Sequence, residues 1–504
     1  MRKLFIILFV LLLSSRAWAA NHYIRDGATG SSPCSDWSSA NACDALPATL
    51  VRGDTYYIAS GSYSGRTFNT ATSGTQYITI KGATAADHGT DTGWSNGYSV
   101  STSDGGSQAV FTSNFTISTS YWNIDGVVGP VLSQTPALYG FSMGTSQATG
   151  FIFSAAVSNI IISHLYAKAG TSSNNEREFI KNNSGCTVTN LTISHCLLDS
   201  WQGFVAAWLA DVNYLIFEYN VCLNLFSSGL NHGECVNPNG GGMNYAIFRY
   251  NWFEGYSTWA SDQSGATGCI VANNNDNANA EIYGNVFYNL WIGNGVITNT
   301  SQGNMLNAKV YNNTFTGITY GVNGAIIVIA SGTVYNNISY NVDNSSISGG
   351  TQANNTNYAS SPFVDYANKN FHLAAPTSAG TSLSSPYNMD VDGNIRGGDG
   401  TWDRGAYEYG ASVNYTVTPS SGANGSISPN TPQQVASGFT TQFTVTPDTG
   451  YTASVGGTCG GSLVGTTYTT NAITANCTVV ATFSPTPVTP TTFKSGKLTG
   501  GIHR

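Results

Sequence analysis

Charged side chains are scarce in this chain. Only 9% of its 504 residues are Asp, Glu, Lys or Arg, against about 25% in an average soluble domain. The 18 Lys and Arg residues form no basic stripe and the formal net charge is −8, so the composition predicts no nucleic-acid partner. A disordered chain is also excluded, because disorder requires high charge and few aromatic residues, whereas aromatic residues reach 12% here.

Long hydrophobic runs are scarce too, and the one that exists stands at the N-terminus. The apolar run Leu4–Leu13 is too short to span a bilayer core of about 30 Å. It follows Arg2 and Lys3 and precedes the small-x-small sequence Ala17-Trp18-Ala19, which is the pattern of a secretory signal peptide. We therefore expect residues 1–19 to be a signal peptide, no membrane span, and a protein that is secreted to the extracellular space or cell surface.

Motifs for metals and phosphates are missing. There is no C-x-x-C pair for zinc and no phosphate-binding loop. Asp390, Asp392 and Asn394 alternate as in a small calcium loop, but the terminal Glu of such a loop is absent. We expect these three residues to belong to a structural cap in which Arg396 or Arg404 pairs with the carboxylates. The sequence thus predicts no cofactor; calcium has no clear ligand set.

What the sequence does contain is a repeat. Short frames such as Glu218–Cys222, Arg249–Phe253 and Tyr311–Phe315 recur at spacings of 24 to 34 residues. In each frame we assign one polar residue to a shared position: His164, His195, Asn220, Asn251, Asn285, Asn313 and Asn337. Repeats of this length that are rich in Val, Ile, Phe and Tyr predict a stack of strands and turns, a parallel β-solenoid.

Residues stacked on adjacent turns of a solenoid lie about 4.8 Å apart, so the repeat predicts columns of side chains. One inward apolar column is Phe217, Phe248, Ile282, Val310 and Val334, and a second is Phe253, Phe287 and Phe315. The polar column should form a ladder of hydrogen-bonded amides at a corner. Glu218 and Arg249 fall in an outward column one turn apart, where we expect a surface salt bridge.

Nine cysteines in an exported chain predict disulfides. Cys34 and Cys43 flank a short loop, and Cys459 and Cys477 flank a hairpin-like stretch, so we expect both pairs to be bonded. The other five lie on different turns of the solenoid, and we expect most of them to be buried as small apolar residues; their pairing is left open: Cys186, Cys196, Cys222, Cys235 and Cys269.

Three segments resemble a known family. They are RGDTYYIASGSY at Arg52–Tyr63, the Asn-x-Phe frames, and the DxDGxxR…WDxGAYEY sequence that ends near residue 410. Together they resemble exported bacterial proteins of the pectate-lyase-like class. The resemblance implies an all-β fold, a right-handed parallel β-helix over residues 20–410 with caps at both ends, plus a small C-terminal β-domain. Residues 411–485 resemble a divergent internalin-type bacterial B-repeat, and residues 486–504 are a Pro/Thr linker and tail.

A second strand of the repeat carries the candidate site. We align its frames on a mostly glycine column, which places Ile180, Val205, Cys235, Ile270, Ile297 and Ile326 inward. Alternation then directs the first, third and fifth residues of each frame outward. This predicts one outward patch on three neighbouring turns: Arg177, Phe179, Lys181, Gln202, Phe204, His232 and Glu234.

That patch is suited to an acidic polysaccharide. Phe179 and Phe204 would offer flat faces to sugar rings, with Gln202 as a further substrate contact. Arg177 and Lys181 would pair with uronate carboxylates. His232 would move a proton near neutral pH, assisted by Glu234. This arrangement predicts lyase-like β-elimination on an extracellular polysaccharide.

Two alternatives remain open from the sequence. A glycoside hydrolase would need a second carboxylate beside Glu234, for which Asp199, Asp211 and Asp262 are the candidates. A non-catalytic surface adhesin, matrix-binding or structural protein would use the same face only for binding. The sequence does not indicate the oligomeric state.

Overall fold

The computed structural model describes two compact units, residues 1–409 and 410–504. The residues that it describes are 19–128, 132–143, 149–169, 178–182, 185–200, 205–206, 211–225, 234–237, 241–255, 268–272, 276–301, 303–320, 325–410, 414–436, 440–473 and 475–486. Three short 3-10 helices occur among them: η1 (Asn96–Tyr98), η2 (Thr102–Asp104) and η3 (Pro136–Leu138). No helix within these ranges is long and apolar enough to cross a membrane.

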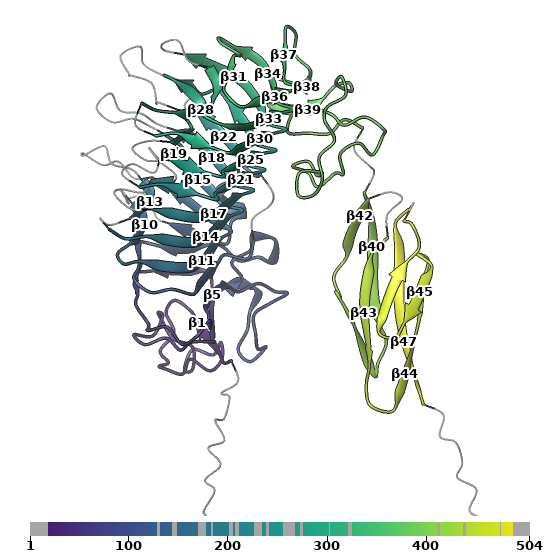
Figure 1. Cartoon of the computed structure of the whole chain (residues 1–504). Helices are drawn as coiled ribbons and strands as arrows, with labels where there is room; N and C mark the ends of the chain where they lie inside the picture. The colour runs from purple at the N-terminus through teal and green to yellow at the C-terminus, as the bar shows by residue number, and fades with distance from the viewer. Residues whose placement is uncertain are drawn as a thin grey trace, which may run out of the picture. The chain divides into compact units, whose positions relative to one another are not determined.

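The first unit is a right-handed parallel β-helix, as the sequence predicts. Each turn of the chain, which we call a coil, adds one strand to each of three parallel sheets, and the coils stack from β1 to β37 (Figure 1).

Sheet A has thirteen strands: β1 (Asn21–Ile24), β2 (Thr55–Ile58), β5 (Ile78–Gly82), β8 (Trp122–Asp125), β11 (Val157–Ser163), β14 (Val188–Ser194), β17 (Val212–Glu218), β20 (Met243–Asn244), β21 (Ile247–Arg249), β25 (Glu281–Tyr283), β30 (Ala308–Tyr311), β33 (Gly332–Tyr335) and β36 (Thr351–Ala353). Sheet B has twelve: β3 (Gly61–Tyr63), β6 (Ala109–Phe111), β9 (Phe141–Met143), β12 (Leu165–Lys168), β15 (Leu197–Asp199), β18 (Val221–Leu225), β22 (Trp252–Gly255), β26 (Val286–Tyr288), β27 (Trp291–Ile292), β31 (Thr314–Tyr320), β34 (Ile338–Val342) and β37 (Thr356–Tyr358). Sheet C has ten: β4 (Thr67–Phe68), β7 (Phe115–Ile117), β10 (Thr149–Phe153), β13 (Glu178–Asn182), β16 (Val205–Ala206), β19 (Val236–Asn237), β23 (Ile270–Ala272), β28 (Gly295–Asn299), β32 (Ala325–Val328) and β35 (Ile347–Ser348). A further short parallel pair joins β24 (Asn277–Ala278) to β29 (Met305–Leu306).

Both predicted apolar columns are confirmed. Phe217 pairs with Phe248, and the column continues through Ile282 and Val310 to Val334 in sheet A. In sheet B the rings of Phe253, Phe287 and Phe315 stack at 5.1 and 5.0 Å. All these side chains are buried, so period-two alternation and coil-on-coil stacking together build the core.

The asparagine ladder is confirmed for its five asparagines and extends to Asn355. Each amide after Asn220 accepts hydrogen bonds from the asparagine one coil before it; for example, the Oδ1 atom of Asn285 accepts from the Asn251 backbone N–H at 3.0 Å and from its Nδ2 at 2.9 Å. Asn220, Asn285, Asn313 and Asn337 are buried as well. The ladder therefore satisfies the buried corner where sheet A turns into sheet B.

The assignment of His164 and His195 to the ladder is wrong. In these two coils the ladder position is held by Leu165 and Cys196, and the Cys196 backbone N–H donates to Asn220 at 3.0 Å. His164 and His195 stand one residue earlier, in the column of Tyr219, and their rings stack at 5.0 Å. That column has positive φ angles, including 54° at His164 and 53° at His195. Asparagine tolerates this conformation, so a polar residue can occupy this position as well as the ladder position. The motif alone therefore does not distinguish the two positions.

The predicted register of sheet C is wrong by one residue in two coils. Val205 pairs with Val236 rather than Cys235, and Ile297 pairs with Ile327 rather than Ile326. A one-residue slip turns every side chain of a strand to the opposite face. The sequence could not decide between two adjacent apolar residues, because either fits an inward column.

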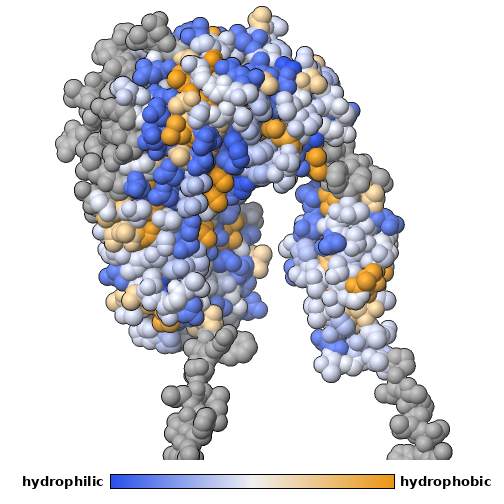
Figure 2. Space-filling model, viewed as in Figure 1, coloured by the Kyte–Doolittle hydropathy of each residue, from blue (hydrophilic) through white to orange (hydrophobic). Residues whose placement is uncertain are grey.

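The C-terminal part of the first unit folds back onto sheets A and B. It contains the antiparallel strands β38 (Phe363–Asp365) and β39 (Asn370–Leu373). Phe371 stacks on Trp252 at 5.2 Å, and Lys369 pairs with Glu254 at 2.6 Å. The surface in view carries hydrophobic residues only as small groups scattered among polar ones (Figure 2).

The second unit consists of two four-stranded sheets around one core. One sheet contains β42 (Gln433–Ala436), β40 (Asn414–Ser421), β47 (Cys477–Pro485) and β44 (Tyr451–Gly456); the other contains β41 (Gly425–Ser428), β43 (Gln442–Pro447), β46 (Thr467–Thr470) and β45 (Gly461–Val464). Val417 and Val479 from the first sheet pack with Phe443 and Tyr468 from the second. The small C-terminal β-domain is thus confirmed, while its likeness to a B-repeat stays a prediction.

Three disulfides are formed. The predicted pairs Cys34–Cys43 and Cys459–Cys477 are both bonded. Cys186, Cys196 and Cys222 are free and buried, as expected. The sequence left the pairing of the remaining two open, and Cys235 and Cys269 form the third disulfide.

Candidate functional site

Sheet C positions two glutamates in one column. Lys181 of β13 and Asn237 of β19 both pair with Ala206 of β16, so they lie on either side of it, two coils apart. Counting back three residues along the chain leads to Glu178, the first residue of β13, and to Glu234, which lies two residues before β19. We call these two residues the acid pair. Because neighbouring strands are about 4.8 Å apart, the acid pair is separated by about 9.6 Å along the column.

Both members of the acid pair are nearly buried. Glu178 is 7% exposed and Glu234 is 6% exposed. Moving a carboxylate out of water is costly unless polar or charged partners replace the lost hydration. The Lys181 ammonium lies 3.8 Å from Oε2 of Glu178, and the Asn237 amide donates to Oε2 of Glu234 at 3.2 Å. Among the described residues, a cation therefore lies beside Glu178 and an amide donates to Glu234.

The Cys235–Cys269 disulfide lies directly beside this column. The observed register places the two cysteines opposite each other, with Cα atoms 4.5 Å apart. The bond ties the coil of Glu234 to the following coil. The sequence predicts Cys235 in the inward column. The observed register places Val236 there, one residue further on.

Phe179 does not face outward, contrary to the prediction. Its side chain is fully buried and its ring packs edge-on against Phe151 at 5.4 Å. Room for the ring exists because the opposite residue is Gly150, where a Cβ atom would come within 2.8 Å of Phe179 Cδ2. A buried ring cannot stack on a sugar, so Phe179 is a core residue.

The other predicted site residues divide into two groups. Lys181 lies on β13 and pairs with Glu178, which the sequence reasoning could not place. The predicted outward orientation of Glu234 is wrong: the one-residue register shift turns it to the face of Val236, and it is only 6% exposed. Arg177, Gln202, Phe204 and His232 lie outside the described residues, so their predicted roles stay predictions.

The predicted carboxylate partners of Glu234 are not supported by their positions. Asp199 ends β15 in sheet B, where it binds Asn224 at 2.7 Å and lies 3.4 Å from Lys168. Asp211 precedes β17 and accepts a hydrogen bond from the Gly242 backbone. Asp262 lies outside the described residues. The register instead brings Glu178 into the column of Glu234. The sequence did not indicate this partner, because Glu178 aligns with the glycines of the other frames.

A second polar cluster lies at the corner between sheets A and B. Nδ1 of His164 contacts Oδ1 of Asp125 at 2.7 Å. Burial would raise the pKa of Asp125, but hydrogen bonds from His164, Ser163 and the Val127 backbone lower it on balance. Burial, with the neighbouring His164, lowers the pKa of His195. The sequence reasoning did not identify Asp125 and His164 as partners, because they are 39 residues apart.

The predicted pairing of Glu218 with Arg249 is confirmed. The Arg249 guanidinium donates to Glu218 at 2.6 Å and to the Tyr283 hydroxyl at 3.0 Å. These residues form one outward column on sheet A. The cation is therefore held by its neighbours and serves to join three adjacent coils.

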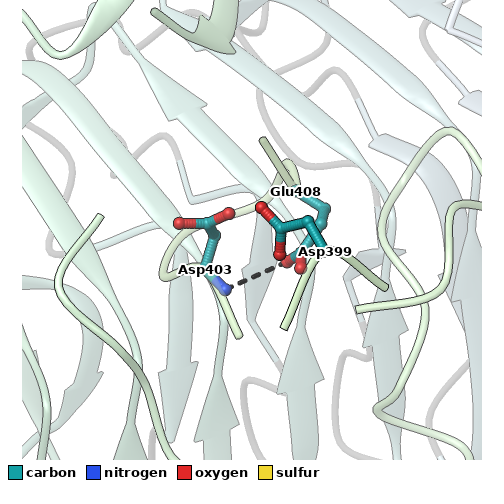
Figure 3. Close-up of side chains that lie close together, drawn as sticks. All are labelled: Asp399, Asp403 and Glu408. Carbon is teal, nitrogen blue, oxygen red and sulfur yellow. Dashed lines mark hydrogen bonds between the residues drawn. The ribbon is translucent and has the colours of Figure 1, made fainter. Parts of the chain in front are cut away.

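Acidic side chains also gather in the cap segment. Carboxylate oxygens of Asp399, Asp403 and Glu408 lie within 4.8 Å of one another (Figure 3). Glu408 accepts hydrogen bonds from the Gly397 and Asp403 backbone N–H groups, and Asp403 accepts from Thr377 and Tyr409. These carboxylates are thus used by the protein itself, which favours a structural role over a metal site.

The cap segment is held by Arg396, but its ion-pair partner is Glu408 and not, as predicted, Asp390 or Asp392. The Arg396 side chain is fully buried, donates to the carbonyl groups of Gly405 and Ala406, and lies 3.5 Å from Glu408. Asp390 accepts backbone hydrogen bonds from Asp392 and Asn394. Arg404 donates instead to Thr356, Asn354 and Ala379.

No protein-family model matches the chain, and no curated protein matches it either. Solved structures similar to it include pectate lyase Pel9A, at 13% identity and a TM-score of 0.39, covering 78% of this chain and 97% of that one. An alginate lyase from Paenibacillus sp. str. FPU-7 shows 13% identity and a TM-score of 0.28 over 62% and 90% of the two chains. A GH136 lacto-N-biosidase from Eubacterium ramulus shows 11% identity and a TM-score of 0.36 over 67% and 68%. All three scores are below 0.5, so the site must be argued from its own residues.

Proposed function

We propose that this chain is an exported enzyme that hydrolyses glycosidic bonds in an extracellular polysaccharide, with the acid pair as its catalytic residues. The observation that carries the proposal is the placement of Glu178 and Glu234 in one column of sheet C, two coils apart and nearly buried. Glycosidases use two carboxyl groups, and those that invert configuration separate them by about 6.5–9.5 Å to admit a water molecule. The spacing of about 9.6 Å between the two backbone positions is close to the upper limit of this range.

The surroundings of each glutamate assign its role. A neighbouring cation stabilises an ionised carboxylate, so Glu178, beside Lys181, is the general base. The remaining role, general acid, then falls to Glu234, to which the Asn237 amide donates a hydrogen bond. Glu178 removes a proton from water as the water oxygen bonds to the anomeric carbon. The glycosidic C–O bond breaks at the same time, and Glu234 gives its proton to the departing oxygen.

The β-elimination predicted from the sequence is less well supported by the described residues. It required His232 as the base and Arg177 or Lys181 as the partner of a uronate. Lys181 already lies beside Glu178, and that negative charge competes with a uronate for the ammonium. An acidic substrate and lyase chemistry therefore remain predictions that depend on Arg177 and His232.

Export is supported by the cysteines. Three disulfides are formed among the described residues, and disulfides persist in oxidising compartments. Together with the predicted signal peptide, they support a substrate outside the cell. The alternative of an adhesin that only binds does not explain two nearly buried carboxylates in one column.

The test is to incubate the full chain with a panel of neutral and acidic polysaccharides. Hydrolysis predicts new reducing ends without an increase in ultraviolet absorbance, because no unsaturated sugar forms. New reducing ends that rise together with ultraviolet absorbance would establish β-elimination instead. Retention of a polymer without any new reducing ends would establish the adhesin.

A further inference from the structure

Tyr214 and Tyr245 are unusual in their exposure. Their side chains are 50% and 49% exposed, whereas every other aromatic residue whose burial the structure describes is buried or half-buried. We call them the tyrosine pair. A large aromatic surface left in water on a protein with an extensive core requires an explanation.

The tyrosine pair belongs to a column at the corner where the chain passes from sheet C to sheet A. The residues of this column have positive φ angles: Tyr121 (64°), Asn159 (58°), Asn190 (54°), Tyr214 (55°), Tyr245 (56°), Asn279 (60°) and Asn307 (51°). Asparagine is the residue that tolerates this left-handed conformation well, and a bulky tyrosine does not. Backbone strain of this kind is retained most often where it serves a function.

The two rings lie parallel, with centroids 4.9 Å apart and planes inclined by 6°. Each ring covers one face of the other, and the outer faces look toward the coils of Asn190 and Asn279. Those side chains are shorter than a tyrosine and bring amide groups beside the rings, whose side chains are about half exposed. Flat apolar faces beside hydrogen-bonding amides are the surface that a sugar ring requires, because a pyranose has an apolar face and a polar rim.

The charge at this corner selects the kind of sugar. The corner residues that the structure describes on these coils, 188–190, 211–214, 241–245 and 276–279, include the exposed carboxylates Asp211 and Asp276 and no cation. A uronate would be repelled by them and would find no partner. The corner is therefore suited to an uncharged sugar.

We propose that the tyrosine pair is a binding platform for neutral sugar residues of the polysaccharide that the acid pair cleaves. The identity of the ligand as that polysaccharide rests on the function proposed above. Tyr245 follows Glu234 by eleven residues in the same coil. A glycan chain held on the platform is thereby kept beside sheet C, and the platform raises its local concentration there.

The test is retention of the full chain in native gels that contain a neutral polysaccharide (galactomannan, xylan or arabinan) or an acidic one (polygalacturonate or alginate). It is carried out with Glu234→Gln as the parent, so that turnover does not remove the polymer. The test variant is Tyr214→Asn/Tyr245→Asn, which introduces the residue common in this column. Tyr121→Asn is the matched control, because it makes the same change in the same column three coils away. Tyr214→Phe/Tyr245→Phe keeps the rings.

The proposal expects a neutral polymer to retard the parent, the Phe variant and the Tyr121→Asn control, and the double Asn variant to bind about tenfold more weakly or less. The double Asn variant should melt at the same or a higher temperature, because the strain is relieved. Three results would overturn the proposal: unchanged retention of the double Asn variant, retention by acidic polymers alone, or no retention by any polymer. Because the gel reads binding, its outcome is independent of whether the acid pair is catalytic.

Discussion

Glu178 and Glu234 each stand three residues before a residue that pairs with Ala206 of β16, namely Lys181 and Asn237. They are 56 residues apart in the chain, and only the winding of the β-helix makes them neighbours. Each has a side chain of different charge three residues further on, Lys181 or Asn237. This asymmetry allows two identical carboxyl groups to take opposite roles in one reaction.

The two roles can be separated by the leaving group. Glu234→Gln should slow polysaccharide cleavage by about 10²–10⁴-fold, because the departing sugar oxygen needs a proton. The same variant should cleave a nitrophenyl glycoside of the released sugar within about tenfold of wild type, since a nitrophenolate leaves without protonation. Glu178→Gln should be slow on both substrates and should be rescued by azide. Equal losses on both substrates for Glu234→Gln would contradict its role as the acid.

The Cys235–Cys269 disulfide should matter for both stability and activity. Cys235→Ala/Cys269→Ala should lower the free energy of unfolding by about 2–4 kcal/mol, because the crosslink no longer restricts the unfolded chain. It should also reduce glycan cleavage, since Glu234 adjoins Cys235. Thermal unfolding and initial rates provide the measurements.

The matched control for that experiment is Cys459→Ala/Cys477→Ala, which removes a disulfide from the second unit. This change should lower the melting temperature of the C-terminal unit and leave the rate unchanged. Equal rates for wild type and Cys235→Ala/Cys269→Ala would show that the bond does not position Glu234.

The asparagine ladder should be a major source of stability. In Asn285→Ala the Asn251 backbone N–H loses its acceptor, and the Phe248 carbonyl loses a donor at 2.8 Å. Buried polar groups left without partners cost about 1–3 kcal/mol each, so we expect a loss of about 2–4 kcal/mol in urea unfolding. Asn357→Ala, at an exposed position of β37, should change the unfolding midpoint little. Similar midpoints for the two variants would contradict the role of the ladder.

The stability of the first unit should depend on pH through His195 and His372 in opposite directions. Burial lowers the pKa of His195, so its contribution is present above pH 6.5 and is lost as the pH falls. The hydrogen bond with Asp392 raises the pKa of His372, so its contribution is present below pH 6.5 and is lost as the pH rises. Melting temperatures from pH 5 to 8 therefore should fall less toward pH 5 in His195→Asn than in wild type, and more in His372→Asn. Parallel profiles for the three proteins would contradict both assignments.

The sequence predicted sheets A and B well for a physical reason. Their columns combine a large apolar residue with an asparagine at a fixed offset, as in Phe248 and Asn251, so only one register satisfies both the core and the ladder. The same reading failed at His164 and His195, where the ladder position is filled by the apolar Leu165 and Cys196. An alignment based on the polar residue is displaced by one position wherever that residue stands at the adjoining corner position.

Sheet C could be predicted only in part. The adjacent apolar residues Cys235 and Val236 both fit an inward column, and nothing local distinguishes them. The burial of Phe179 depended on Gly150, a residue of the preceding coil. The acid pair emerged only when the correct register moved Glu234 by one position into the column of Glu178.

The most direct test of this account is the initial rate of reducing-end formation by wild type, Glu178→Gln, Glu234→Gln and Glu281→Gln on a polysaccharide that the wild type cleaves. Glu281 lies on sheet A and pairs with Lys309, so its variant controls for the loss of an ion-paired glutamate away from sheet C. We predict losses of about 100-fold or more for each member of the acid pair and a rate close to wild type for Glu281→Gln. Folded Glu178→Gln and Glu234→Gln variants that cleave the polymer at the wild-type rate would contradict it.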